Sequence, residues 1–488
     1  MNSWIVRICS AAGEVSAEAK LYLALLRRQH GDMLVRGVDE TVVKRLGISQ
    51  RVAARVVAEL VAAEHLKPAP MPSTGKPGRP AVIYTVQPEI MEPGLINGTT
   101  LWQGKEAGSH FELLIEGLLT EPSAWSGERA KPGQMPSREG AAKRLSASNR
   151  LLLAVLLGLA NRNGVVRGWG LSSLAKLVGL SQVSHEGQVG KLLRLGYLRT
   201  VIPGVSGRRL FGTKPGVFFL SLSHPSYNGS IPEVLLLYPV ESLEHIERGQ
   251  GEARALYRYL QVFRQRPRAV DWNAYYGKLL QAAGFVDMVE LRSLAYLFDG
   301  VGTSTLADYL QVTVEQYASR LMPYSHTDHD AALHSLREVI DHELWPKGDR
   351  GRADSRENLV RLILFLADRL ARLIGNALSN TPDLTGRQGG EVLDKMSYAI
   401  VPAITGSRGS YFAISAMPAE ASNRSPRYLV LECERNSFVT RLSGGMLSDA
   451  ESCDYGLITR GRMSREAPER IKEVREHLRM LAIRKLAE

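Results

Sequence analysis

The sequence has little cysteine and no long apolar run. Its three cysteines, Cys9, Cys433 and Cys453, are too few and too far apart for a disulfide framework or a zinc site. The longest apolar run, residues 151–160, is shorter than the roughly 18 residues that a membrane span needs. Arg7 and Glu14 interrupt any secretory signal. These absences favour a reducing, cytoplasmic setting and no membrane partner.

The sequence also lacks the common motifs of catalysis. It has no Walker-type phosphate loop, no paired metal carboxylates and no nucleophile with matched partners. His326, Asp328, His329 and Asp330 resemble a metal site, but Asp328 and Asp330 are natural caps and favour an ordinary helix start. We therefore expect no cofactor, no metal and no enzymatic activity.

The basic charge is unevenly distributed along the chain. A length of 488 residues is too great for one core, so several domains are expected. The net charge is +11, and residues 1–225 contain 28 Lys and Arg against 16 Asp and Glu. The remaining residues contain 33 against 34. Basic charge concentrated in one half is typical of proteins that bind phosphate backbones.

That basic half contains an internal repeat. Gly47-Ile48-Ser49-Gln50 recurs as Gly179-Leu180-Ser181-Gln182, at an offset of 132 residues. The apolar positions recur at the same offset: Leu21, Leu25, Val57, Leu60 and Leu66 correspond to Leu153, Leu157, Val189, Leu192 and Leu198. The repeat therefore defines two related units, here the first copy (residues 16–86) and the second copy (residues 146–222).

Each copy predicts three helices followed by a hairpin. In the first copy Ser16, Asp39 and Ser49 are the expected N-caps, and Gly47 ends the second helix. The third helix, residues 50–64, has an apolar stripe. In the second copy the helices are expected at 149–160, 172–178 and 182–195. Basic Gly-rich turns near residues 75–80 and 207–209 predict the hairpins.

Both copies resemble winged helix domains. The resemblance covers about a third of the chain and implies that each third helix enters the DNA major groove, with the hairpin wing on phosphate or in the minor groove. It implies these DNA-binding residues in the first copy: Gln50, Arg51 and Arg55 on the helix, Lys76 and Arg79 on the wing. In the second copy they are Gln182, Ser184, His185, Gln188 and Lys191, with Arg208 and Arg209 on the wing.

The copies differ where base preference would be set. Arg51 and Arg55 correspond to Val183 and Gly187. Either the two domains contact different half-sites, or the second contributes mainly backbone contacts or a protein interface.

The expected fold is mainly α with small β wings. The predicted domains are winged helix 1 (1–100), a linker with a short helix near 111–119 (101–145), winged helix 2 (146–225), a helical domain (226–380) and a small α+β domain (381–488). Strands are expected at 397–404, 411–417, 427–434 and 438–442, and a terminal helix at 469–486. Residues 306–313 are expected to form either a degenerate third copy or an ordinary pair of helices.

The resemblance implies a sequence-specific transcriptional regulator. Its partner would be double-stranded DNA, and the C-terminal half would serve oligomerisation, as a homodimer or with a partner protein, or effector response. The alternative is a replication initiator or partition-type protein of a plasmid or mobile element. An enzyme that acts on DNA is a third class, which the missing catalytic motifs disfavour.

Overall fold

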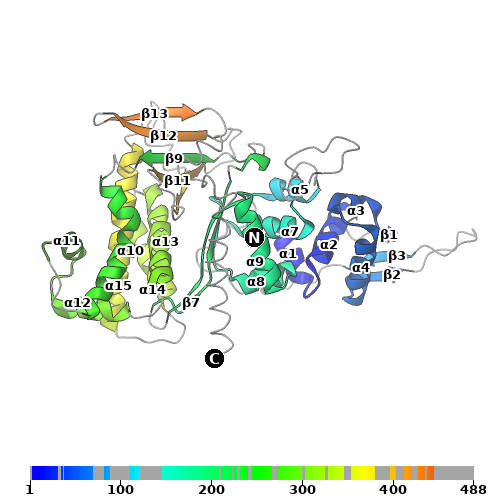
Figure 1. Ribbon diagram of the computed structural model, residues 1–488, viewed down its shortest axis with the longest axis horizontal. Coiled ribbons are helices and arrows are strands. Elements are labelled where there is room, and N and C mark those ends of the chain that lie inside the picture. The colour runs from blue at the N-terminus through cyan, green and yellow to red at the C-terminus, as the bar shows by residue number, and fades with distance from the viewer. Residues whose placement is uncertain are drawn as a thin grey trace, which may run out of the picture. The chain divides into compact units, whose positions relative to one another are not determined.

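The computed structural model shows a mainly helical chain with small sheets (Figure 1). It describes residues 3–30, 34–36, 38–69, 82–87, 110–120, 145–207, 210–222, 224–227, 231, 233–239, 244–265, 272–298, 303–324, 328–345, 353–379, 396–402, 411–418, 427–434 and 437–443. These divide into two compact units. The N-terminal unit holds the described residues up to Leu198 and residues 224–227, and the C-terminal unit holds the rest.

The first copy contains three helices and a three-stranded antiparallel sheet, in which β3 lies between β1 and β2. Asp39 caps the second helix, and Gly47, at φ +67°, ends it in a left-handed turn that favours glycine. The elements are α2 (Ala17–His30), β1 (Leu34–Arg36), α3 (Glu40–Leu46), α4 (Gln50–Ala62), β2 (Leu66–Ala69) and β3 (Ile83–Val86).

The second copy has the same order of helices and principal strands, with two additional short strands, β6 and β7, that pair with each other. Its sheet has the strand order β4-β8-β5, equivalent to β1-β3-β2 in the first copy. Gly179, at φ +79°, again ends the second helix, and Ser146 caps the first. The elements are α7 (Ala147–Leu159), β4 (Val165–Val166), α8 (Leu171–Val178), α9 (Gln182–Arg194), β5 (Leu198–Ile202), β6 (Val205–Ser206), β7 (Thr213–Lys214) and β8 (Val217–Leu220). The third helices predicted at 50–64 and 182–195 are confirmed.

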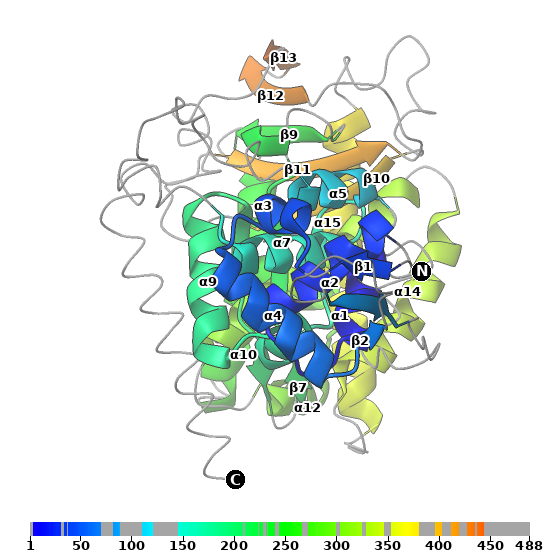
Figure 2. The ribbon, with the colours of Figure 1, turned by 90° about the vertical axis from the view of Figure 1, so that its right-hand side faces the viewer.

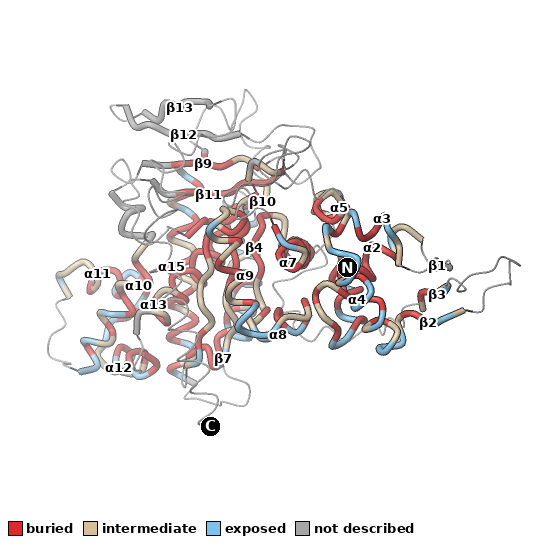
Figure 3. The backbone as a smooth tube through the Cα atoms, turned by 45° about the vertical axis from the view of Figure 1, so that its right-hand side comes forward, coloured by how far each residue is buried: buried red, intermediate tan, exposed pale blue. Residues whose placement is uncertain are grey.

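Helix α7 is the centre of the N-terminal unit. All residues from Ser148 to Leu159 are buried, as Figure 3 shows. Two further helices pack on it: α1 (Trp4–Ala11) and α5 (Glu112–Thr120). The sequence predicted α5 but not α1. A Cβ on Gly158 of α7 would lie 2.8 Å from the Cβ of Ser3, so this glycine permits the close approach of the segment that begins α1.

The C-terminal unit joins a helical bundle to a five-stranded sheet. The helices are α10 (Glu244–Gln265), α11 (Tyr275–Ala282), α12 (Met288–Leu297), α13 (Thr303–Leu321), α14 (His329–Leu344) and α15 (Ala353–Ser379). The sheet order is β10 (Met396–Val401), β11 (Tyr411–Pro418), β9 (Val234–Pro239), β12 (Arg427–Glu434) and β13 (Ser437–Ser443). Figure 1 shows the sheet across one end of α10, α13 and α15.

Strand β9 departs from the expected domain order. It precedes the helices in the chain, yet it pairs with β11 and, in parallel, with β12. Helix α13 packs on β10, where the Ile400 amide donates to Ser319 Oγ at 3.0 Å. The expected helical and α+β domains therefore share one compact unit. Residues 306–313 lie within the single helix α13, so they form neither a third copy nor a pair of helices. The terminal helix expected at 469–486 lies outside the described residues.

None of the helices that the structure describes is long and apolar enough to span a membrane.

A buried carboxyl group lies on α13. Glu315 is 2% exposed, and Gln311 Nε2 donates to its Oε1 at 3.1 Å. Burial raises the pKa of Glu315 to about 8. The native protein therefore keeps this group protonated at neutral pH, whereas the unfolded chain ionises it.

Replacing Glu315 tests this protonation state. Because its folded pKa lies above its ordinary value of 4.5, the native state holds the extra proton, and the unfolding free energy should fall as the pH rises from about 4.5 to about 8. Glu315→Gln stays neutral and should remove up to about 1.4 kcal/mol per pH unit of that decline. Urea unfolding at pH 5, 6.5 and 8 measures it. Glu338→Gln, at an exposed position of α14, is the control, and equal slopes for wild type and Glu315→Gln would contradict an elevated pKa.

Candidate nucleic-acid interface

Helix α4 presents the polar face that the sequence predicts. Ser49 Oγ accepts from the Val52 amide at 3.3 Å and fixes the start of the helix. Ala53, Val56, Val57 and Leu60 are buried on one face. On the opposite face Gln50, Arg51 and Arg55 are all exposed. Within the described part of the chain, no ion pair engages either arginine.

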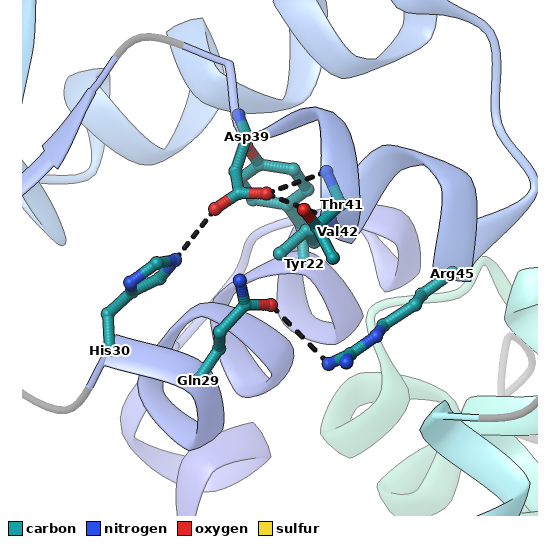
Figure 4. A network of polar contacts seen from close by, with 7 residues as sticks. All are labelled: Tyr22, Gln29, His30, Asp39, Thr41, Val42 and Arg45. Carbon is teal, nitrogen blue, oxygen red and sulfur yellow. Dashed lines mark hydrogen bonds and ion pairs between the residues drawn. The ribbon is translucent and has the colours of Figure 1, made fainter.

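A polar network fixes the helix that precedes α4 (Figure 4). Asp39 Oδ1 accepts from the amides of Thr41 and Val42, and Asp39 Oδ2 lies 2.7 Å from His30 Nε2 at the end of α2. The Asp39 amide donates to the Tyr22 hydroxyl at 3.0 Å. Burial alone would raise the pKa of Asp39, but these amides and His30 hold it below its usual range. The charged carboxylate thus ties α3 to α2.

Helix α4 itself is tied to the start of α2. The carboxylate of Glu59 accepts from both the amide and the hydroxyl of Ser16, the latter at 2.7 Å. In the second copy Asn149 Nδ2 of α7 donates to the Gln188 carbonyl of α9 at 3.2 Å. Both third helices are therefore anchored to the first helix of their own copy.

Helix α9 presents a different surface. Ser181 Oγ accepts from the Ser184 amide, and Gln182 and Ser184 are exposed. Gln188 and Lys191 are only partly exposed, and burial and then Arg194 lower the pKa of Lys191. The most exposed apolar side chain of α9 is Val183, at 82%. Val183 is not among the predicted contact residues, although the repeat offset aligns it with Arg51.

His185 does not lie on the exposed face of α9, and its predicted DNA contact is wrong. Its side chain is 0% exposed and packs on the same helix face as Val189 and Leu192. The repeat offset places His185 at the position of Ala53, which is also buried. Burial lowers the pKa of His185 to about 4, so the ring is neutral at physiological pH.

The four predicted wing-tip residues, Lys76, Arg79, Arg208 and Arg209, lie outside the described residues. The strands that flank them are present: β2 pairs with β3 antiparallel in the first copy, and in the second copy β6 pairs with β7 antiparallel on either side of the turn at 207–209. Both expected hairpins therefore have their strands in place.

Comparison of the chain with protein-family models, characterised proteins and solved structures gives no match.

Replacing His185 tests the burial of its ring. The folded pKa of about 4 lies below the ordinary value of 6.5, so the unfolded chain takes up a proton first as the pH falls. The buried neutral ring makes its full contribution to the unfolding free energy above pH 6.5, and this contribution should be lost as the pH falls from about 6.5 to about 4. His185→Leu should lose less stability over this interval, by up to about 1.4 kcal/mol per pH unit.

Urea unfolding between pH 7 and pH 4, with hydrogen exchange of the α9 amides, measures this difference. The control is His334→Gln, because His334 is exposed on α14. If His185→Leu and wild type lose stability in parallel, the ring is accessible to protons in the native state.

Proposed function

We propose that this protein is a sequence-specific, double-stranded DNA-binding transcriptional regulator that contacts its operator through two tandem winged helix domains. The observation that carries the proposal is the recurrence of one architecture: three helices and a sheet in which the last strand lies between the first two. In both copies a serine caps the third helix, and the first residues of that helix are exposed: Gln50 and Arg51 in α4, and Gln182, Val183 and Ser184 in α9. That helix is the one that enters the major groove in helix-turn-helix proteins.

Helix α4 suits guanine recognition. Arg51 and Arg55 are four residues apart, so they lie on one face of the helix. An arginine can donate two hydrogen bonds to the O6 and N7 atoms of guanine in the major groove. Gln50, at the first position of the helix, matches adenine in the same way.

Helix α9 suits a different base pattern. The exposed Val183 offers an apolar contact to a thymine methyl group, and Gln182 can pair with adenine. Ser184 can serve as either donor or acceptor. This surface favours the interpretation that the second copy contacts a half-site of its own over a role limited to the phosphate backbone.

The C-terminal unit, in this proposal, serves oligomerisation or effector response. The runner-up function is a replication initiator or partition-type protein. A genomic-fragment selection with the purified chain at physiological salt separates the two. Sites that overlap promoters support a regulator, whereas clustered repeats at one origin support an initiator, and no enrichment contradicts both.

Arg51→Ala tests base readout. Loss of a bidentate guanine contact should cost about 1–3 kcal/mol at one position and relax the preference there. By contrast, Arg208→Ala on the predicted wing should weaken binding to all sequences and lower the salt slope by about 1. Selection from randomised DNA gives the preference, and titrations at several salt concentrations give the slope.

The matched control is Arg292→Ala, which removes the same charge from an exposed position of α12 in the C-terminal unit. It should leave affinity and preference unchanged. Equal, sequence-independent losses from Arg51→Ala and Arg208→Ala would contradict the assignment of Arg51 to base contacts.

A further inference from the structure

The two copies contact each other through buried cations. Lys20 of α2 is 1% exposed, and its ammonium donates to three carbonyl oxygens: Cys9 at 3.0 Å, Lys176 at 3.1 Å and Leu177 at 2.9 Å. Two of these carbonyls belong to the last turn of α8 in the second copy. All three ammonium protons therefore have acceptors, and the positive charge lies at the negative end of a helix dipole.

The second copy makes the corresponding contact with the first. Arg150 of α7 is 2% exposed, and its guanidinium donates to the carbonyls of Arg45, at 3.1 Å, and Leu46, which belong to the last turn of α3. Burial lowers the pKa of Arg150 to about 10, so the group stays charged at neutral pH.

These two contacts are reciprocal. At the repeat offset, the start of α2 corresponds to the start of α7, and the end of α8 corresponds to the end of α3. The start of each first helix thus contacts the end of the other copy's second helix. In addition, α2 and α7 pack side by side (Figure 2). Ser148 Oγ at the start of α7 donates to Glu18 at 3.1 Å. A contact in which the same patch of both partners is used is isologous, and it relates the partners by a two-fold axis.

Close backbone approach reinforces the contact. The Ala17 amide donates to the Gly179 carbonyl at 3.2 Å. A Cβ on Gly179 would lie 2.2 Å from the Val15 carbonyl oxygen and 2.9 Å from the carbonyl carbon of Ser16, so any side chain there would push the copies apart. The equivalent Gly47 has a similar positive φ but nothing within 4 Å of such a Cβ.

We propose that the two copies, residues 16–86 and 146–222, act as one rigid DNA-binding module with approximate two-fold symmetry. The chain would then bind a single composite DNA site, made of two dissimilar half-sites in inverted orientation at one fixed separation. This inference rests on the proposed function. Each third helix starts three residues after the glycine that ends the contacted helix, so the contact fixes both recognition helices relative to each other. In helix-turn-helix dimers, the two-fold symmetry of the protein is matched by inverted half-sites.

The first test uses the unaltered full-length protein and its selected DNA site. We expect two inverted half-motifs. Inserting about 5 bp, half a helical turn, between them should reduce affinity about a hundredfold, because only one half-site is then engaged. Inserting about 10 bp should not restore binding, since a rigid module cannot move its two recognition helices apart by a full turn of DNA. Directly repeated half-motifs, or recovery at 10 bp, would overturn the inference and leave the proposed function intact. Failure to select any DNA sequence would overturn both.

The second test uses a matched pair of glycine variants. Gly179→Ala and Gly47→Ala both place a side chain at a positive φ, but only at Gly179 would the added Cβ meet the backbone of the segment that enters the first copy. We expect Gly179→Ala to lower affinity for the composite site about a hundredfold while a single half-site is still bound as by wild type. Gly47→Ala should keep the wild-type dependence on spacing. Equal behaviour of the two variants would show that the contact does not govern DNA binding.

Discussion

The N-terminal unit depends on the hydrogen bonds that two buried cations donate to the ends of helices. Removing Lys20 and Arg150 from water is costly, and the carbonyls at a helix end would also lose free energy if buried without donors. Both costs are offset only when the buried cation donates hydrogen bonds to the buried carbonyls, as Lys20 does at the end of α8 and Arg150 at the end of α3. Such contacts add little net stability compared with apolar packing, but they form only when the donor and acceptor atoms have the right distances and angles. Their main consequence is therefore one definite arrangement of the copies.

The same ammonium holds elements beyond the two copies. The third acceptor of Lys20 is the Cys9 carbonyl, so α1 is tied to the point where the first copy contacts the second. Gly158 allows the segment that begins α1 to approach α7 closely, and Gly179 allows the chain at Val15 to approach the end of α8. Helix α1 and the segment that follows it are thus part of the contact between the copies.

Local patterns predicted the local structure well. Serine and aspartate caps and helical periodicity placed α4 and α9 within two residues of their observed ends, and strand β12 was predicted at its observed bounds. The central strand β9 was not predicted, because a six-residue apolar segment does not distinguish a strand from a helix and its partners lie more than 170 residues later. The buried positions of Lys20 and His185 did have a signal: the repeat offset pairs Lys20 with the buried Leu152, and His185 with the buried Ala53.

The copies share the backbone positions that define their fold and their contact, but they differ in the side chains that make this contact and in those that would contact bases. Gly47 and Gly179 both end the second helix of their copy in a left-handed turn. By contrast, Arg51 and Val183 occupy the same position of the third helix, and one is charged while the other is apolar. The contact is also unequal, since Glu18 and Arg150 occupy equivalent positions and carry opposite charges. Arg150 donates to the carbonyls at the end of α3, whereas Glu18 accepts from Ser148, so the two equivalent positions make different contacts. Because the two copies belong to one chain, their sequences can diverge independently, and under the proposed function each copy is free to keep its own half-site preference.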